Sequence, residues 1–113
     1  KYIDVKINGS NVKVPFQSMI YAEHFSHMMH IYTTNKKELI TRQSFESFLS
    51  ALKMDTRFYQ CNRGIVINLD HALDFDGTVF TLDNGNQIPV SRKLSKHARQ
   101  TFMDYLFQRR TSS

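Results

Sequence analysis

Apolar and polar residues alternate along most of the chain, and residue pairs that favour tight turns interrupt the alternation. Residues 2–7 alternate up to Asn8-Gly9, a pair that readily adopts the positive φ angles of a hairpin turn. Asp76-Gly77 and Asn84-Gly85 mark two further turns of this kind. Turn signals at such short intervals predict many short antiparallel strands. The predicted strands cover residues 2–7, 12–14, 19–24, 28–33, 38–41, 72–75, 78–82 and 87–90.

One internal segment has helical spacing instead. The apolar residues Phe45, Phe48, Leu49 and Leu52 stand at positions i, i+3, i+4 and i+7. Ser44 precedes them and is a typical helix N-cap. This pattern predicts a short amphipathic helix over residues 44–53.

The C-terminal segment repeats the helical spacing over a longer span. Its apolar residues between Leu94 and Leu106 predict a helix over residues 93–107 that packs on the sheet. We expect residues 108–113 to form a flexible tail. The chain contains no linker or internal repeat, so residues 1–107 are predicted to form a single domain.

Composition narrows the range of partners. The 113 residues include 15 Lys and Arg against 10 Asp and Glu, and the resulting net charge of +5 favours a polyanionic partner such as nucleic acid. No apolar run approaches the length of about 18 residues that spans a bilayer. The single cysteine, Cys61, cannot form an internal disulfide bond. These features predict a cytoplasmic protein without membrane contact, and the start at Lys1 suggests a fragment of a longer chain.

Catalytic and metal chemistry have weak support in the sequence. His24, His27 and His30 have a suggestive spacing, but strand parity places His27 opposite the other two, so we expect no metal site. Cys61 lies between apolar residues and is expected to be a buried core residue rather than a nucleophile. No known catalytic or cofactor-binding motif is present. We therefore expect neither an enzyme nor a cofactor.

Basic residues are concentrated in the predicted loops. Lys36 and Lys37 stand in one loop, Arg63 in another, and Arg92 with Lys93 in a third. An Arg side chain can pair bidentately with guanine in the major groove, whereas Lys mostly neutralises phosphates. The pattern therefore favours a domain that contacts DNA with side chains on loops.

Three segments resemble the signatures of LytTR DNA-binding domains and occur in the order typical of that family. The central segment is Phe58–Asn68, with the sequence FYQCNRGIVIN. Pro89–Lys93, with the sequence PVSRK, resembles the second signature, and Ile20–Glu23, with the sequence IYAE, resembles the third. The resemblance covers residues 3–107.

The resemblance implies a fold and a function. The fold is mainly β, an elongated β-β-β arrangement of about ten short strands with a short internal helix and a C-terminal helix. Such domains lie at the C-terminus of bacterial response regulators, which implies a receiver or other regulatory domain preceding this fragment. They bind direct repeats in double-stranded promoter DNA through loops that enter successive major grooves, and two copies pair on tandem sites.

Site residues follow from the resemblance position by position. The residues expected to contact bases are Arg63, Arg92, His27 and Met29. Those expected to contact the DNA backbone are Asn62, Lys93, Lys96 and Ser26, to which the concentration of basic residues in loops adds Lys36 and Lys37. Three positions depart from the family pattern, namely Gln60, Asn62 and Gly64, so we expect a sequence preference different from that of relatives.

An alternative from another class is a protein-interaction or sensory module without DNA specificity. In that hypothesis the Met28-Met29 pair and exposed aromatic residues bind a partner, and the positive charge serves only solubility. RNA binding is a third possibility, but the sequence lacks the aromatic signature with which RNA-recognition motifs stack on bases.

Overall fold

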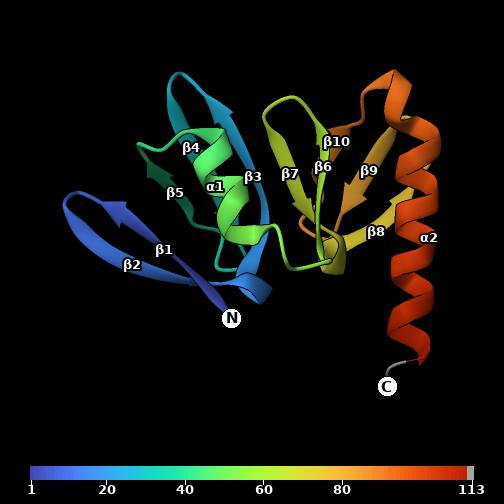
Figure 1. Cartoon of the computed structure of the whole chain (residues 1–113), viewed down its shortest axis with the longest axis horizontal. Coiled ribbons are helices and arrows are strands. Elements are labelled where there is room, and N and C mark those ends of the chain that lie inside the picture. Colours follow the sequence, from blue (N-terminus) through green and yellow to red (C-terminus); the bar gives the residue numbers. More distant parts are fainter. Residues whose placement is uncertain (112–113) are drawn as a thin grey trace.

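A computed structural model describes residues 1–111 of the chain, in which ten strands and two α-helices are arranged around a central sheet (Figure 1). The strands are β1 (Tyr2–Ile7), β2 (Ser10–Pro15), β3 (Met19–Phe25), β4 (Met28–Thr33), β5 (Glu38–Thr41), β6 (Phe58–Asn62), β7 (Ile65–Asn68), β8 (Ala72–Phe75), β9 (Val79–Leu82) and β10 (Gln87–Pro89). The helices are α1 (Phe45–Leu52) and α2 (Ser95–Thr111), with 3₁₀ turns η1 (Phe16–Ser18), η2 (Leu69–His71) and η3 (Arg92–Leu94). The predicted mainly β fold class is therefore confirmed.

The central sheet has five antiparallel strands in the order β5-β4-β3-β7-β6. Strand β3 lies in the middle because it pairs with β4 through a hairpin and with β7 across a long stretch of sequence. The pairing with β7 sets Ala22 opposite Val66. The turn of the β3–β4 hairpin and that of the β6–β7 hairpin therefore lie at the same end of the sheet (Figure 1).

One face of the central sheet is covered by α1 and by the β1–β2 hairpin. Helix α1 buries Phe48 and Leu52 against this face, as its apolar spacing predicts. Ser44 caps the helix, since its hydroxyl accepts a hydrogen bond from the Ser47 amide at 3.1 Å. The core on this side also contains Met29 and Ile31 from β4.

The other face is covered over β7 and β6 by the three-stranded sheet β10-β9-β8 and by α2. Phe80 of β9 lies at its centre and contacts Phe75, Tyr59 and Phe102 through their rings. Every residue of β7 is buried, because both faces of this strand are covered.

The C-terminal helix differs from its prediction at both ends. Residues Arg92–Leu94 form the 3₁₀ turn η3, so the α-helix begins at Ser95. It continues to Thr111 rather than ending at residue 107, and Arg109 in this extension forms an ion pair with Asp70 at 3.6 Å. The remainder of the expected tail, residues 112–113, lies outside the described part of the chain.

Asn68 at the end of β7 joins three segments of the fold. Its side chain is fully buried, and its Nδ2 donates hydrogen bonds to the carbonyl oxygens of Phe16 at 3.1 Å and Met19 at 2.9 Å. Its Oδ1 accepts a hydrogen bond from the Asp70 amide at 2.9 Å, which starts the turn η2. The Asn68 amide thus connects β7 to the segment that enters β3.

We expect Asn68→Ala to lower the free energy of unfolding by roughly 2–4 kcal/mol, because buried backbone groups lose their partners. Asn68→Asp is expected to be at least as destabilising, since a carboxylate cannot donate to two carbonyl oxygens. Urea denaturation of both variants tests this, with Asn11→Ala at an exposed position of β2 as the control. Equal stabilities for Asn68→Ala and Asn11→Ala would contradict the role assigned to Asn68.

Candidate nucleic-acid interface

The β3–β4 hairpin ends in a two-residue turn that exposes its side chains. Ser26 and His27 have φ angles of 51° and 64°, as both central residues of a type I′ turn do. The flanking residues Phe25 and Met28 are paired in the sheet, so the hairpin remains regular up to the turn. Both turn residues are exposed.

The β6–β7 turn lies against this hairpin and presents Arg63. The His24 amide donates a hydrogen bond to the Gly64 carbonyl oxygen at 2.8 Å, which joins the two hairpins. Gly64 has a φ of 84°, and a Cβ atom at this position would lie 3.3 Å from the His24 carbonyl oxygen. Both the positive φ angle and the lack of room for a Cβ atom favour glycine at this position. The backbone therefore fixes the point from which the exposed Arg63 side chain leaves the sheet.

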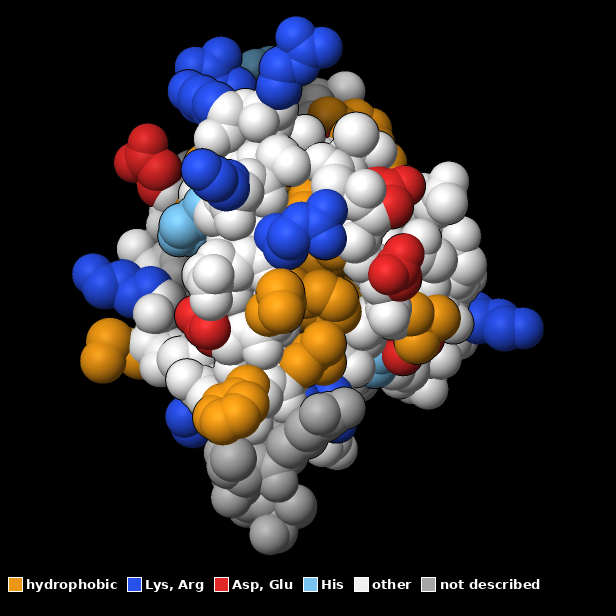
Figure 2. All heavy atoms as spheres, turned by 90° about the vertical axis from the view of Figure 1, so that its right-hand side faces the viewer, with side chains coloured by type: hydrophobic (Ala, Val, Ile, Leu, Met, Phe, Trp, Pro, Cys, Tyr) orange, Lys and Arg blue, Asp and Glu red, His pale blue; other side chains and the backbone are white. Residues whose placement is uncertain are grey.

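The segment that follows β10 is joined to the same end of the sheet by two hydrogen bonds. The Ser91 amide donates to the Cys61 carbonyl oxygen at 3.1 Å, and the Asn62 side-chain amide donates to the Pro89 carbonyl oxygen at 2.5 Å. Arg92 follows at once and is exposed. The basic residues Lys93 and Lys96 extend this surface onto η3 and the start of α2, and Figure 2 shows basic side chains gathered at this end of the molecule.

The end of β5 completes the row of loops on the other side of the β3–β4 hairpin. Thr41 is paired with Met29, so Arg42 and Gln43 emerge beside the β3–β4 turn. Arg42 is exposed, and sequence reasoning did not single it out. Its position just before the Ser44 N-cap was a signal that could have identified it, because a basic residue there stands on a loop at a helix start. We call the residues of these loops, 26–27, 42–44, 63–64 and 91–93, the loop edge.

One carboxylate lies close to the α2 end of this row. Asp76 belongs to the β8–β9 turn, which contacts the start of α2 because the Ser95 hydroxyl donates to the Gly77 carbonyl oxygen at 2.6 Å. Hydrogen bonds from the backbone amides of Val79 and Thr78 lower the pKa of Asp76. This carboxylate is held by its own turn and is not paired with the neighbouring cations.

The comparisons with known proteins agree with this architecture. The family model described as LytTr DNA-binding domain matches residues 9–103. The chain belongs to the LytTR family. A solved structure of the LytTr DNA-binding domain assigned to a methyl-accepting/DNA response regulator from Bacillus cereus superposes with a TM-score of 0.71 at 21% identity, covering 88% of this chain and 94% of that one. No curated protein matches the chain.

Membership in the family confirms the resemblance found in the sequence, and it makes this protein a DNA-binding domain. LytTR is a family of DNA-binding domains and not of enzymes. Within the described residues, no helix is both long enough and apolar enough to cross a membrane.

Met29 was wrongly predicted to contact bases in this LytTR domain. Its side chain is fully buried in the core beneath α1. The two-residue turn after Phe25 sets the register of β4. Met29 therefore points to the face that α1 covers, and Met28 points to the opposite face. The Met28-Met29 pair therefore does not form a joint contact surface, and the alternative of a protein-interaction module loses this support.

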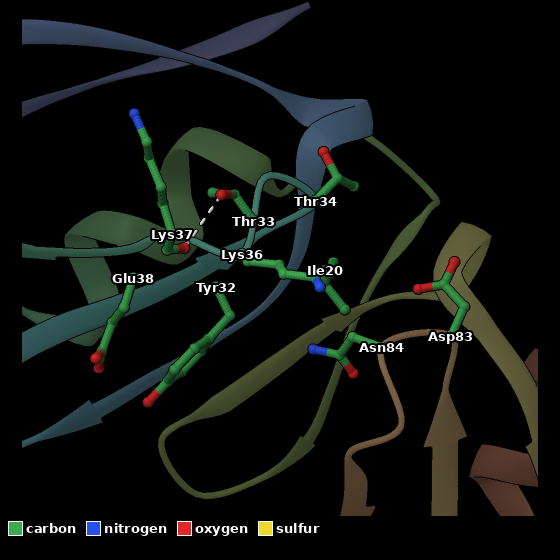
Figure 3. A pocket seen from close by; sticks show the side chains of 9 residues that line it. All are labelled: Ile20, Tyr32, Thr33, Thr34, Lys36, Lys37, Glu38, Asp83 and Asn84. Carbon is green, nitrogen blue, oxygen red and sulfur yellow. Dashed lines mark hydrogen bonds between the residues drawn. The ribbon is translucent and has the colours of Figure 1, made fainter.

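Lys36 and Lys37 do not belong to the loop edge. They lie in the β4–β5 turn, and the six-residue strand β4 separates this turn from the β3–β4 turn by about 20 Å. In Figure 3, Lys36 extends over a hollow toward Asn84 of the β9–β10 turn, whereas Lys37 points away from it. The structure therefore separates these two predicted backbone-contacting residues from Arg63 and Arg92. The sequence did not show at which end of the sheet this loop lies.

The three histidines occupy different environments. His24 and His30 lie on neighbouring strands, and His27 lies in the turn between them, where strand parity does not apply. His30 stacks on the Phe25 ring, and its Nδ1 is 2.8 Å from Glu38 Oε2, a hydrogen bond that lowers the pKa of Glu38. In residues 1–111, no group of three or more His, Cys, Asp or Glu side chains is placed to hold a metal ion.

Cys61 is buried, as its apolar neighbours indicated. Burial raises the pKa of its thiol to about 12, which leaves almost no reactive thiolate near neutral pH. The side chain belongs to the core between β6 and the second sheet.

We expect iodoacetamide at pH 8 to leave Cys61 unmodified in the folded domain, because at a pKa of about 12 only about one thiol in ten thousand is ionised. The same reagent should label it in denaturant. Intact-mass measurement follows the reaction, and equal labelling rates in both conditions would contradict the burial of this side chain.

Gly64→Ala is expected to destabilise the domain by at least about 1–2 kcal/mol, the cost of a positive φ for a residue with a Cβ atom. It should also weaken DNA binding, since crowding against His24 shifts the turn that carries Arg63. Gly85→Ala is the matched control, because Gly85 has a φ of 91° with no atom near its Cβ position and lies at the other end of β10. Denaturation and DNA binding by fluorescence anisotropy separate the two effects. Equal loss of DNA binding in both variants would show that the contact of Gly64 with His24 is not the cause of the weaker binding.

Proposed function

We propose that this LytTR domain reads a specific promoter sequence as the output domain of a bacterial response regulator in the cytoplasm. The observation that carries the proposal is the loop edge, where hydrogen bonds between loops hold exposed Arg63 and Arg92 next to one another. The Bacillus cereus structure, whose name places it in a response regulator, supports the regulatory context.

The dimensions of the loop edge suit a duplex that lies along it. Four strand spacings separate β5 from β6, which amounts to about 19 Å, and the β10–η3 loop extends the row further. The longest extent of the molecule is 40 Å. One turn of B-DNA measures about 34 Å, so the whole molecule is long enough to lie over two successive major grooves.

The exposed side chains divide into two roles. Arg63 and Arg92 have the planar donors that recognise guanine, and His27 at the β3–β4 turn can contact a neighbouring base edge. Four residues around them are assigned to the phosphate backbone, and these are Ser26, Asn62, Lys93 and Lys96. The Asn62 amide also holds the Pro89 carbonyl oxygen, so this residue positions the loop of Arg92.

We further propose that two copies bind direct repeats in tandem, under the control of a receiver or other regulatory domain in the full-length protein. Direct repeats place both copies in the same orientation on the DNA, so each loop edge meets an equivalent pair of grooves.

Selection of binding sites from a random duplex library, followed by footprinting, tests the proposed function. We expect an enriched motif that occurs as a direct repeat. Enrichment of an inverted repeat would contradict the tandem arrangement, and absence of any enriched motif would contradict sequence-specific binding.

Arg63→Ala and Arg92→Ala are each expected to cost roughly 1–3 kcal/mol of affinity for the enriched duplex and to relax the preference at one base position. Lys96→Ala should instead weaken enriched and random duplexes by the same factor. Lys37→Ala is expected to bind like the wild type, since this residue lies at the opposite end of β4. Gel-shift titrations compare the four variants, and wild-type affinity of both Arg variants would refute the assignment.

A further inference from the structure

A shallow depression of about 430 Å³ lies at the β5 end of the loop edge. Its lining comes from β3, from the β3–β4 turn and from the connection between β5 and α1. The lining residues are His24, His27, Arg42, Gln43 and Ser44.

The residues that line the depression carry groups that can donate hydrogen bonds to an anion. None of the five lining side chains is a carboxylate, and each can donate a hydrogen bond. Arg42 adds a permanent positive charge and is exposed at the rim. An anion in the depression would thus meet donors from three segments of the chain.

Two of the donors are held in place by contacts of their own. The Gln43 side-chain amide donates to the Ser47 hydroxyl at 3.1 Å, and the Ser47 amide donates to the Ser44 hydroxyl at 3.1 Å. These bonds fix Gln43 and Ser44 against the first turn of α1. The positive end of the α1 dipole adds to the local potential, and the exposed Glu46 in that turn opposes it.

The location of the depression defines which anion it would meet. His27 lines it and also stands in the β3–β4 turn assigned to the DNA, so the depression continues the loop edge on the side away from Arg63 and Arg92. A duplex that contacts His27 would bring the backbone beside that contact to Arg42.

We propose that this depression binds a DNA backbone phosphate that flanks the bases read by the domain, with Arg42 supplying the charge. This inference rests on the proposed function, because it requires DNA to lie along the loop edge. Arg42 then contributes affinity for any sequence and fixes the register of the domain on its site, while Arg63 and Arg92 supply the preference.

The first test measures Arg42→Ala by fluorescence anisotropy on the enriched duplex and on a random 30-base-pair duplex, over a range of salt concentrations. Both affinities should fall by the same factor at low salt, and the slope of log affinity against log salt should become shallower by about 0.9. The ratio of wild-type affinity to variant affinity should consequently fall by about 3.5-fold between 50 and 200 mM salt.

Lys53→Ala is the matched control, since it also removes one exposed cation but lies at the far end of the eight-residue α1, about 12 Å from its start. It should leave the affinity and the salt slope unchanged. An Arg42→Ala variant that binds like the wild type overturns the proposal, and so does one that loses affinity only for the enriched duplex, because Arg42 would then read a base. Failure of the wild type to bind either duplex would instead refute the proposed function itself.

The second test locates the phosphate. Single phosphates of the enriched duplex are neutralised one at a time by methylphosphonate substitution, and the affinity of each duplex is measured with the wild type and with Arg42→Ala. We expect one flanking position at which neutralisation weakens the wild type but not the variant, as in a double-mutant cycle. Equal sensitivity of both proteins at every position would overturn the proposal.

Discussion

The pairing of β3 with β7 is the constraint on which the rest of the structure depends. It joins the first half of the chain to the second, with α1 and three strands between the partners. Because the two strands are antiparallel and Glu23 is set opposite Ile65, the β3–β4 and β6–β7 turns lie at one end of the sheet. The same pairing divides the core, since Val66 faces α1 and its neighbours Ile65 and Ile67 face the second sheet. One register therefore determines both the packing and the position of the loops that we propose to contact DNA.

The loops of this edge are held mainly through backbone atoms. His24 and Gly64 are joined by main-chain groups, as are Ser91 and Cys61, and the Asn62 side chain adds a bond to the Pro89 carbonyl oxygen. The side chains of Arg63 and Arg92 are consequently not needed to hold the loops together. Exposed side chains at the positions of Arg63 and Arg92 can therefore be replaced without disturbing the bonds that hold the loops.

Local features of the fold could be predicted from the sequence, whereas features that depend on register could not. The hairpin at Asn8-Gly9 and the helix capped by Ser44 follow from neighbouring residues, and the structure contains both. Met29 was misplaced because a shift of one residue moves a side chain to the other face of the sheet. Lys36 and Arg42 flank the same strand, β5, and only the pairing of that strand shows that Arg42 lies on the loop edge and Lys36 at the opposite end. The C-terminal helix runs past its predicted end, and Arg109 in that extension forms an ion pair with Asp70, a partner that is distant in sequence.

The distribution of ion pairs explains how a chain with a modest net charge of +5 can still carry cations without an internal ion pair on one side of the molecule. In the described part of the chain, the ion pairs of Asp4, Asp55 and Asp70 involve Lys1, Lys13, Arg57 and Arg109, all of which lie away from the loop edge. The remaining pairs, His30 with Glu38 and His71 with Asp83, do not include a cation of the loop edge either. The cations of the loop edge can therefore meet phosphates without first breaking an internal ion pair. Neutralising a phosphate then releases counterions from the DNA with little electrostatic cost to the protein, which is the condition for strong and salt-sensitive binding.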